Sequence, residues 1–173
     1  MRAEILAAVL VVASLAGIPL WIVWEEGRVA RSAAPGEERI LTLTAIAERG
    51  IWTEEEVVGH SYWRREPEVA RPVVRAGEPV TLRLKSADVS HSFAIPELDV
   101  GPFPVEPGHV TVASFVAAEP GEFLFQCSTR CGPCHEEMLG TMVVLASGES
   151  AEDYPPGLLP ARTKCPLHQG GTP

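Results

Sequence analysis

The sequence has few basic residues and no internal repeat. Its 173 residues include 14 lysines and arginines against 23 aspartates and glutamates, which gives a formal net charge of −9. A chain so short of positive charge is a poor candidate for binding nucleic acid, and it leaves room for a basic partner.

Residues 39–146 also lack any sustained apolar period of 3.6 residues, so long amphipathic helices are not expected there. Sixteen prolines and fifteen glycines are spread along the chain and indicate many turns. Short alternating or β-branched runs take the place of helices, at residues 40–47, 80–86, 110–117, 122–127 and 141–147. The pattern predicts a mainly β fold, an antiparallel β-sandwich.

One long apolar run occurs, ILAAVLVVASLAGIPLWIVW at residues 5–24. It is uncharged and about long enough to span a bilayer. A cleaved signal peptide is the alternative, but the apolar regions of signal peptides are shorter, roughly 7–15 residues, and no convincing small-x-small cleavage site follows. We therefore expect a single transmembrane helix at 1–24, a linker at 25–38, the β domain at 39–147 and a Pro- and Gly-rich tail at 148–173.

Three of the four cysteines lie in the segment CSTRCGPCHEEM, residues 127–138. Cys131 to His135 spell C-x-x-C-H, the attachment motif of c-type haem. The helices that usually enclose such a haem are missing from the pattern, and Met138 lies too close to His135 to reach the opposite face easily. A Cys-Gly-Pro-Cys dithiol motif would need a βαβ setting, which is absent. Structural zinc would require the adjacent Cys134 and His135 as ligands, which is awkward for tetrahedral coordination.

A fourth interpretation uses Cys127, Cys131, His135 and Met138 together, on a loop that joins two predicted strands. Two thiolates, an imidazole and a thioether are ligands that suit copper. A second imidazole, that of His91, directly follows the predicted strand at 80–86. A mononuclear blue-copper site needs only one cysteine, whereas two thiolates can bridge two copper ions.

At these residues the sequence resembles subunit II of the haem-copper oxidases, the cytochrome c oxidase family. The soluble domain of that family is a cupredoxin-like Greek-key β-sandwich that carries the binuclear CuA centre. DVSHSFAIPEL is similar to the segment that gives the first histidine ligand, and CSTRCGPCHEEM fits C-x-x-x-C-x-x-x-H-x-x-M at every ligand position. VVGHSYW, VRAGEPVTLRLKSADV and GTMVV match further stretches, so the resemblance covers most of the chain.

The resemblance implies two copper ions held by six ligands. Cys127 and Cys131 would supply two bridging thiolates, and His91 and His135 would supply one imidazole for each copper. Met138 would supply a thioether, and Thr129 would supply its backbone carbonyl. A rigid β-scaffold would fix these ligands, so that oxidation and reduction change little geometry. The site would move electrons and would not transform a substrate, so no catalytic residue is predicted.

Several positions depart from the family pattern. Where this chain has Thr129, the family usually has a glutamate that helps to hold a magnesium ion, and we do not expect that ion here. The aromatic stretch is depleted, with Tyr62 and Trp63 followed by Arg64. Trp63, with Tyr62 beside it, is either the residue that first accepts electrons or a packing residue. Trp52 is expected in the core. Many members have two membrane spans, and here we expect one.

The implied function is that of a non-catalytic electron-transfer subunit of a membrane terminal oxidase, an oxidoreductase complex. It would take electrons from a cytochrome c or a small copper protein and pass them to the haem-bearing catalytic subunit I. The copper domain would lie on the periplasmic, extracytoplasmic side of the cell membrane. The alternative is a membrane-anchored protein that binds or delivers copper without a partner reductase.

Two cysteines remain outside the expected ligand set, Cys134 in the copper loop and Cys165 in the tail. Unpaired thiols tend to be oxidised outside the cytoplasm, and an even remainder suggests a disulfide between them. Two independent cysteines are the alternative.

Overall fold

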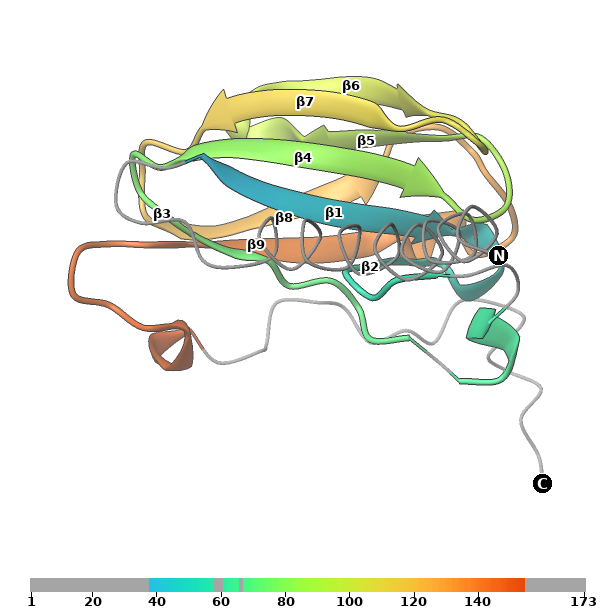
Figure 1. Cartoon of the computed structure of the whole chain (residues 1–173), viewed down its shortest axis with the longest axis horizontal. Coiled ribbons are helices and arrows are strands. Elements are labelled where there is room, and N and C mark those ends of the chain that lie inside the picture. Colours follow the sequence, from blue (N-terminus) through green and yellow to red (C-terminus); the bar gives the residue numbers. More distant parts are fainter. Residues whose placement is uncertain (1–37, 58–60, 66, 155–173) are drawn as a thin grey trace, which may run out of the picture. The chain divides into compact units, whose positions relative to one another are not determined.

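The structure is a computed structural model that describes residues 38–57, 61–65 and 67–154 (Figure 1). The expected transmembrane helix at 1–24, nearly all of the linker and most of the tail lie outside these residues. Within the described ranges, no helix is both long and apolar enough to cross a membrane.

The described residues form two β-sheets, which face each other in a sandwich (Figure 1). The four-stranded sheet has the order β2 (Ile51–Thr53), β1 (Arg39–Ile46), β4 (Pro79–Ser86) and β7 (Thr111–Val116). The five-stranded sheet has the order β3 (Val73–Arg75), β9 (Leu139–Leu145), β8 (Gly121–Cys127), β5 (His91–Ile95) and β6 (Val100–Val105).

Short 3-10 helices occupy several of the connections. They are η1 (Ala47–Arg49), η2 (Ser61–Trp63), η3 (Pro96–Leu98), η4 (His135–Glu137) and η5 (Ala151–Asp153). η1 ends at Gly50, which has a φ of 59° and therefore adopts the left-handed conformation that glycine tolerates best. This turn reverses the chain from β1 into β2.

The predicted mainly β sandwich is confirmed, and each of the five predicted strands forms within two residues of its expected position. The expectation of a wholly antiparallel arrangement is wrong at two places. β1 pairs with β4 in parallel, and β3 pairs with β9 in parallel. The reason is that β3 belongs to the other sheet, so the chain leaves the four-stranded sheet after β2 and returns to it as β4. Such a crossover, unlike a hairpin, permits parallel pairing.

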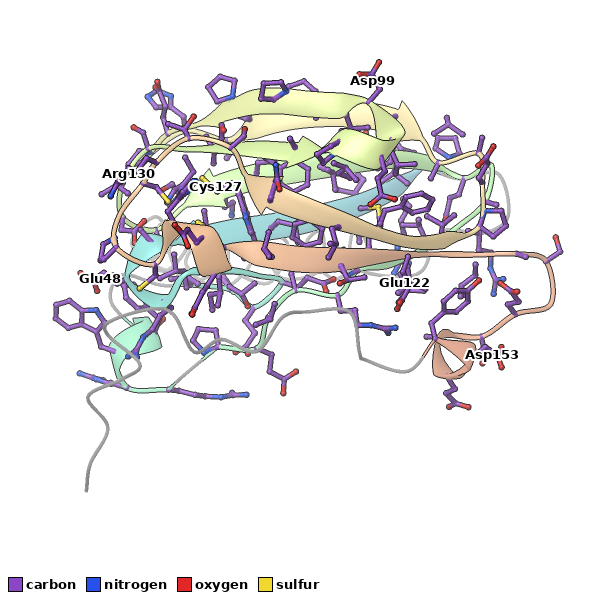
Figure 2. The ribbon with its side chains drawn as sticks, turned by 180° about the vertical axis from the view of Figure 1, so that it is seen from behind. Glu48, Asp99, Glu122, Cys127, Arg130 and Asp153 are labelled. Carbon is purple, nitrogen blue, oxygen red and sulfur yellow. The ribbon has the colours of Figure 1, made fainter. Side chains whose placement is uncertain are left out.

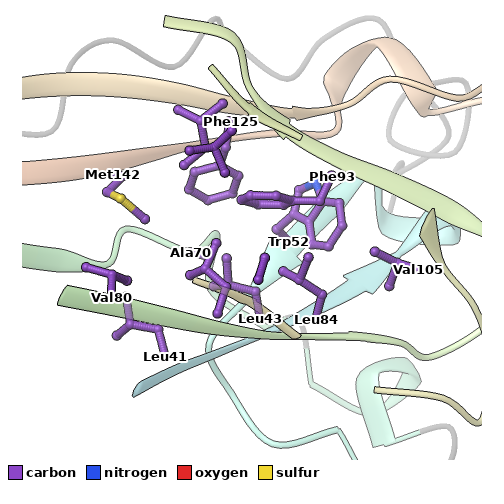
Figure 3. Close-up of a cluster of buried hydrophobic side chains, with 14 of the residues drawn as sticks. Leu41, Leu43, Trp52, Ala70, Val80, Leu84, Phe93, Val105, Phe125 and Met142 are labelled. Carbon is purple, nitrogen blue, oxygen red and sulfur yellow. The ribbon is translucent and has the colours of Figure 1, made fainter. Parts of the chain in front are cut away.

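The core lies between the sheets and follows the alternation of the strands (Figure 3). In β4, Val80, Leu82 and Leu84 are completely buried, whereas Arg83 is exposed. Trp52, expected in the core, is also fully buried. Removing a large apolar side chain from water stabilises the fold by about 1.5–3 kcal/mol, so this layer provides a firm base for the loops at its ends.

Aromatic rings run through the core toward one end of the sandwich. Trp52 meets the edge of Phe93 with ring centroids 5.2 Å apart, and Phe93 lies 5.4 Å from Phe125. Gly140 makes room for this last ring, because a Cβ at that position would lie 2.1 Å from a carbon of Phe125. The strands that carry Phe93 and Phe125 also carry the residues of the candidate site.

Candidate metal centre

The candidate site lies where β8 ends and β5 begins. Cys127 is the last residue of β8, and its Cα is paired with that of Phe93 in β5. This register brings Cys127 beside His91, the first residue of β5. Figure 2 shows Cys127 and Arg130 at one end of the sandwich and Glu122 at the other.

The loop after Cys127 folds back on itself before β9 starts. The backbone N–H of Cys127 donates to the carbonyl of Met138 over 3.1 Å, which closes the base of the loop. Within the loop, the N–H of His135 donates to the carbonyl of Gly132, and that of Met138 donates to the carbonyl of His135. These bonds fix the turns of the loop that carry His135 and Met138.

Two thiols and two imidazoles form the centre of the site. The sulfurs of Cys127 and Cys131 lie 3.7 Å apart. Nδ1 of His91 lies 3.8 Å from the sulfur of Cys127, and Nδ1 of His135 lies 3.6 Å from the sulfur of Cys131. Each of the two sulfurs therefore has a different histidine beside it.

The two ligands expected to be weak lie beside the same sulfurs. The carbonyl oxygen of Thr129 is 3.1 Å from the sulfur of Cys127. The thioether sulfur of Met138, which is fully buried, is 3.5 Å from the sulfur of Cys131. All six residues expected as ligands thus gather around one pair of sulfurs.

The chemistry of these groups fits copper. The ligand atoms of His91, Cys127 and Cys131 all lie within 4.8 Å of one another. Thiolate and thioether sulfur with imidazole nitrogen is a soft donor set, which favours copper over magnesium or calcium. His91 and Cys127 are buried, whereas Cys131 is only half-buried, so the site is closed on the core side and more open toward the loop.

The pKa values of the two thiols are shifted in opposite directions. The contact with Cys131 lowers the pKa of Cys127 far below its ordinary value, despite the opposing effect of burial. The same contact, together with burial, raises the pKa of Cys131. One thiolate is therefore readily available as a metal ligand, the form in which cysteine binds metals.

Asp88 is a residue of the site that the sequence analysis did not predict. Its Oδ1 lies 2.9 Å from Nε2 of His91. Burial alone would lower the pKa of His91, but the hydrogen bonds with Asp88 and Cys127 outweigh it and raise the pKa. Burial would likewise raise the pKa of Asp88, and its hydrogen bonds, that with His91 foremost, lower it instead. The one signal in the sequence was the position of Asp88, three residues before a histidine expected to bind metal.

A small cluster of hydroxyl groups holds the start of the loop, directly after Cys127. Oγ of Ser92 lies 2.5 Å from Oγ of Ser128 and also accepts the backbone N–H of Ser128. The hydroxyl of Thr129 donates to Oγ of Ser92 over 3.1 Å. These contacts hold the peptide whose carbonyl faces Cys127.

Tyr62 and Trp63, the candidates for accepting electrons, have different surroundings. Tyr62 is buried, with only 2% of its surface exposed, whereas Trp63 is 59% exposed. The indole N–H of Trp63 donates to Oε2 of Glu48 over 2.7 Å. Residues 58–60 of the VVGHSYW stretch lie outside the described residues.

Cys134 is separate from the sulfur pair. It is buried and disulfide-bonded, and its sulfur lies 3.9 Å from the carbonyl oxygen of Glu48. A Cβ at Gly50 would lie 2.7 Å from the Cβ of Cys134, so the copper loop packs tightly on the η1 turn. Cys165 lies outside the described residues, so its pairing with Cys134 stays a prediction.

Part of this chain is similar in sequence to a known enzyme. One curated relative, nitrous-oxide reductase of Ralstonia nicotianae, is 38% identical over 77 residues. That match covers 42% of this chain and 12% of the relative, so the chain spans only a small part of that protein.

Two solved structures are also similar to parts of this chain. The periplasmic domain of subunit II of the cytochrome oxidase of Bradyrhizobium japonicum is 25% identical, with a TM-score of 0.48, over 65% of this chain and 88% of that one. Auracyanin A, a blue copper protein of Chloroflexus aurantiacus, is 13% identical, with a TM-score of 0.44, over 63% of this chain and 100% of that one.

The match to a protein family is the more extensive finding. The family described as cytochrome c oxidase subunit II, periplasmic domain, matches residues 44–146, which is more than half of the chain. The match includes both sheets, apart from residues 39–43 at the start of β1, and all six residues gathered around the sulfur pair. Such a domain implies copper, a cupredoxin-like fold and a place outside the cytoplasm. The chain belongs to the cytochrome c oxidase subunit II family.

Proposed function

We propose that this chain is the electron-transfer subunit of a membrane terminal oxidase and that it holds a binuclear CuA centre. One observation carries the proposal. Two thiol sulfurs lie 3.7 Å apart, and each has its own imidazole nitrogen within 3.8 Å. A mononuclear copper site does not need a second thiolate, whereas two bridged ions would use both thiolates and both imidazoles.

The residues of the chain would divide the work as follows. Cys127 and Cys131 would bridge the ions, His91 and His135 would each bind one ion through Nδ1, and Met138 with the carbonyl of Thr129 would complete the two coordination spheres. When bound, the copper pair supplies a one-electron redox couple shared by both ions.

The surrounding fold would keep the ligands from moving during that redox change. His91 and Cys127 belong to paired strands of one sheet, and the Nε2 side of His91 is fixed by Asp88. Met138 is buried between the loop and the core. A site whose ligands already occupy their final positions needs little reorganisation when an electron arrives or leaves.

Membership of the family supports a proposal for the partners and the location. We propose that a cytochrome c or a small copper protein donates the electrons and that a haem-bearing subunit I accepts them. The formal net charge of −9 suits a basic donor, because complementary charge speeds encounter. The copper domain would lie on the extracytoplasmic side, anchored by the apolar segment at 5–24.

Copper loading of the purified full-length chain tests this proposal. Two coppers per chain should bind and give a mixed-valence spectrum. Cys127→Ser or Cys131→Ser should abolish that spectrum, because either change removes a bridge. Cys134→Ser should leave the spectrum in place, since the sulfur of Cys134 faces Glu48 instead of the sulfur pair. A positive haem stain would contradict the proposal and favour the C-x-x-C-H interpretation.

A single copper per chain, lost readily to a chelator, would favour the copper-delivery alternative. A delivery protein must release its metal, and this requires at least one labile ligand. An electron-transfer centre should instead keep both ions through repeated oxidation and reduction.

A further inference from the structure

A continuous series of hydrogen bonds joins the exposed Trp63 to the expected copper ligand His91. The indole N–H of Trp63 donates to Oε2 of Glu48 over 2.7 Å. The backbone N–H of Glu48 donates to Oδ2 of Asp88 over 3.3 Å, and that of the adjoining Ala47 donates to the same oxygen over 2.7 Å. The other oxygen of Asp88, Oδ1, lies 2.9 Å from Nε2 of His91.

We propose that electrons enter the copper centre along this series, from Trp63 through Glu48 and Asp88 to His91. The inference rests on the proposed function and assigns roles to Glu48 and Asp88, which neither the family pattern nor the sequence analysis supplied. One electron leaves a reduced donor docked at Trp63, and the donor is oxidised by one unit. The metal held by His91 is reduced by one unit. No bond breaks, no proton is transferred, and the indole is neither oxidised nor reduced.

The outer end of the path is fixed at the surface. Trp63 is 59% exposed, whereas the neighbouring Tyr62 is buried in a cluster with Ile46 and Ile51. The guanidinium of Arg49 donates to the carbonyl of Tyr62 over 3.2 Å. η2 is thus tied to the η1 turn, and the indole is presented to solvent in a defined position.

The inner end is fixed by the carboxylate of Asp88. Its side chain is only 12% exposed, and both of its oxygens take part in the path. The backbone N–H of Asp88 donates to Oγ of Ser86, which holds the carboxylate at the end of β4. Nδ1 of His91 faces Cys127, so Nε2 and Nδ1 connect the path to the metal through a single ring.

The competing route runs through the apolar cluster. It would pass from the ring of Trp63 to the ring of Tyr62, with the two centroids 6.1 Å apart, and then across the apolar contacts of Tyr62 with Ile46 and Ile51. The side chain of Tyr62 also hydrogen-bonds to Glu48, so a branch that leaves Tyr62 by this bond rejoins the proposed path. Electron tunnelling falls steeply with each gap through space and much less along covalent and hydrogen bonds. The hydrogen-bonded route has steps of 2.7–3.3 Å between heavy atoms and is therefore the better coupled one.

The test compares two substitutions at Glu48 that remove the same charge. Glu48→Gln keeps an oxygen that can accept the indole N–H, whereas Glu48→Met has similar length and no such oxygen. Glu106→Met is the control, because Glu106 is an exposed acid whose side chain has no place in the path. Full-length, copper-loaded protein is reduced by ferrous mitochondrial cytochrome c, and the first-order rate at saturating cytochrome is followed through the copper absorption.

We expect Glu48→Gln and Glu106→Met to keep the wild-type rate and Glu48→Met to lose most of it. The reduction potential and the copper spectrum should be the same in all four proteins, so that driving force does not explain the difference. In copper-free protein, the proton resonance of the Trp63 indole N–H should move in Glu48→Met and stay in place in Glu48→Gln.

Equal rates in Glu48→Met and wild type, with normal copper spectra, would overturn the path and leave the proposed function intact. A slowed Glu48→Gln with a rate equal to that of Glu48→Met would also overturn it, because charge alone would then explain the loss. A wild-type protein without a two-copper spectrum would overturn the proposed function and the path together.

Discussion

Nε2 of His91 lies 2.9 Å from Oδ1 of Asp88, so the ring presents its other nitrogen, Nδ1, to the sulfur of Cys127. A carboxylate that fixes one nitrogen of an imidazole selects the tautomer and the orientation of the nitrogen that binds metal. Because Asp88 also accepts two backbone N–H groups of η1, the orientation of His91 depends on that turn as well as on β5.

Asp88→Ala should lower the affinity for copper by about 10–100-fold, the range typical for losing a carboxylate partner of a metal-binding histidine. Asp88→Asn should lose less, since its amide oxygen can still accept from Nε2. Competition against a chelator of known copper affinity measures the change. Glu119→Ala, which removes an exposed acid in the turn before β8, is the control. An Asp88→Ala protein with wild-type affinity would show that His91 needs no such support.

Gly50→Ala should lower the free energy of unfolding more than Gly77→Ala does. Both glycines have positive φ, 59° and 79°, so both changes introduce backbone strain of about 1–3 kcal/mol. Only at Gly50 does the new Cβ meet other atoms, the Cβ and the carbonyl oxygen of Cys134 at 2.7 and 2.8 Å, whereas Gly77 has nothing within 4 Å. Urea denaturation of the copper-free proteins compares the two. Equal losses would mean that the contact between η1 and the copper loop is not close.

The disulfide at Cys134 should have Cys165 as its partner, since Cys127 and Cys131 carry free thiols. In the chain-entropy model, closing the loop between residues 134 and 165 stabilises the folded chain by roughly 3–4 kcal/mol. Peptide mapping under non-reducing conditions should yield a fragment that joins residues 134 and 165. Recovery of Cys165 as a freely alkylated thiol, from membranes prepared without reductant, would contradict the pairing.

The topology proposed for the membrane can be tested with a fusion at Pro173. Periplasmic domains of this family lie outside the cytoplasm, so a reporter that is active only in the cytoplasm should be silent there. Arg28 and Arg31 follow the apolar segment and Arg2 precedes it, a count of basic residues that slightly favours the opposite orientation. A bright reporter would show that these charges set the orientation and that the copper domain faces the cytoplasm.

Local patterns predicted β1, β4, β7, β8 and β9 and missed the other strands, for a different reason in each case. In the sequence of β4, apolar Val80, Leu82 and Leu84 alternate with polar residues, which predicts a strand. Every residue of β5 is buried, and HSFAI shows no such regular alternation. β6 contains Pro102 and Pro104, which argue against a strand in a sequence and are tolerated here because β6 is at the edge of its sheet. β2 and β3 have three residues each, too few to form a pattern.

The candidate site divides in a similar way. The spacing of the loop residues and the family resemblance predict the six expected ligands, because spacing is visible in a sequence. The roles of Asp88 and Glu48 depend on how the η1 turn lies over the end of β4, forty residues later in the chain. Contacts of this kind arise from the packing of distant segments, so no local sequence pattern predicts them. The parallel pairing of β1 with β4 is not predictable from the local sequence for the same reason.

The most direct test of this account is the electron paramagnetic resonance spectrum of the copper-loaded full-length chain in its oxidised form. If Cys127 and Cys131 bridge two ions, one unpaired electron is shared equally, and its hyperfine pattern should report two equivalent copper nuclei. The metal content should be two coppers per chain. A pattern from a single copper nucleus, with one copper per chain, would contradict the binuclear centre on which the proposed function depends.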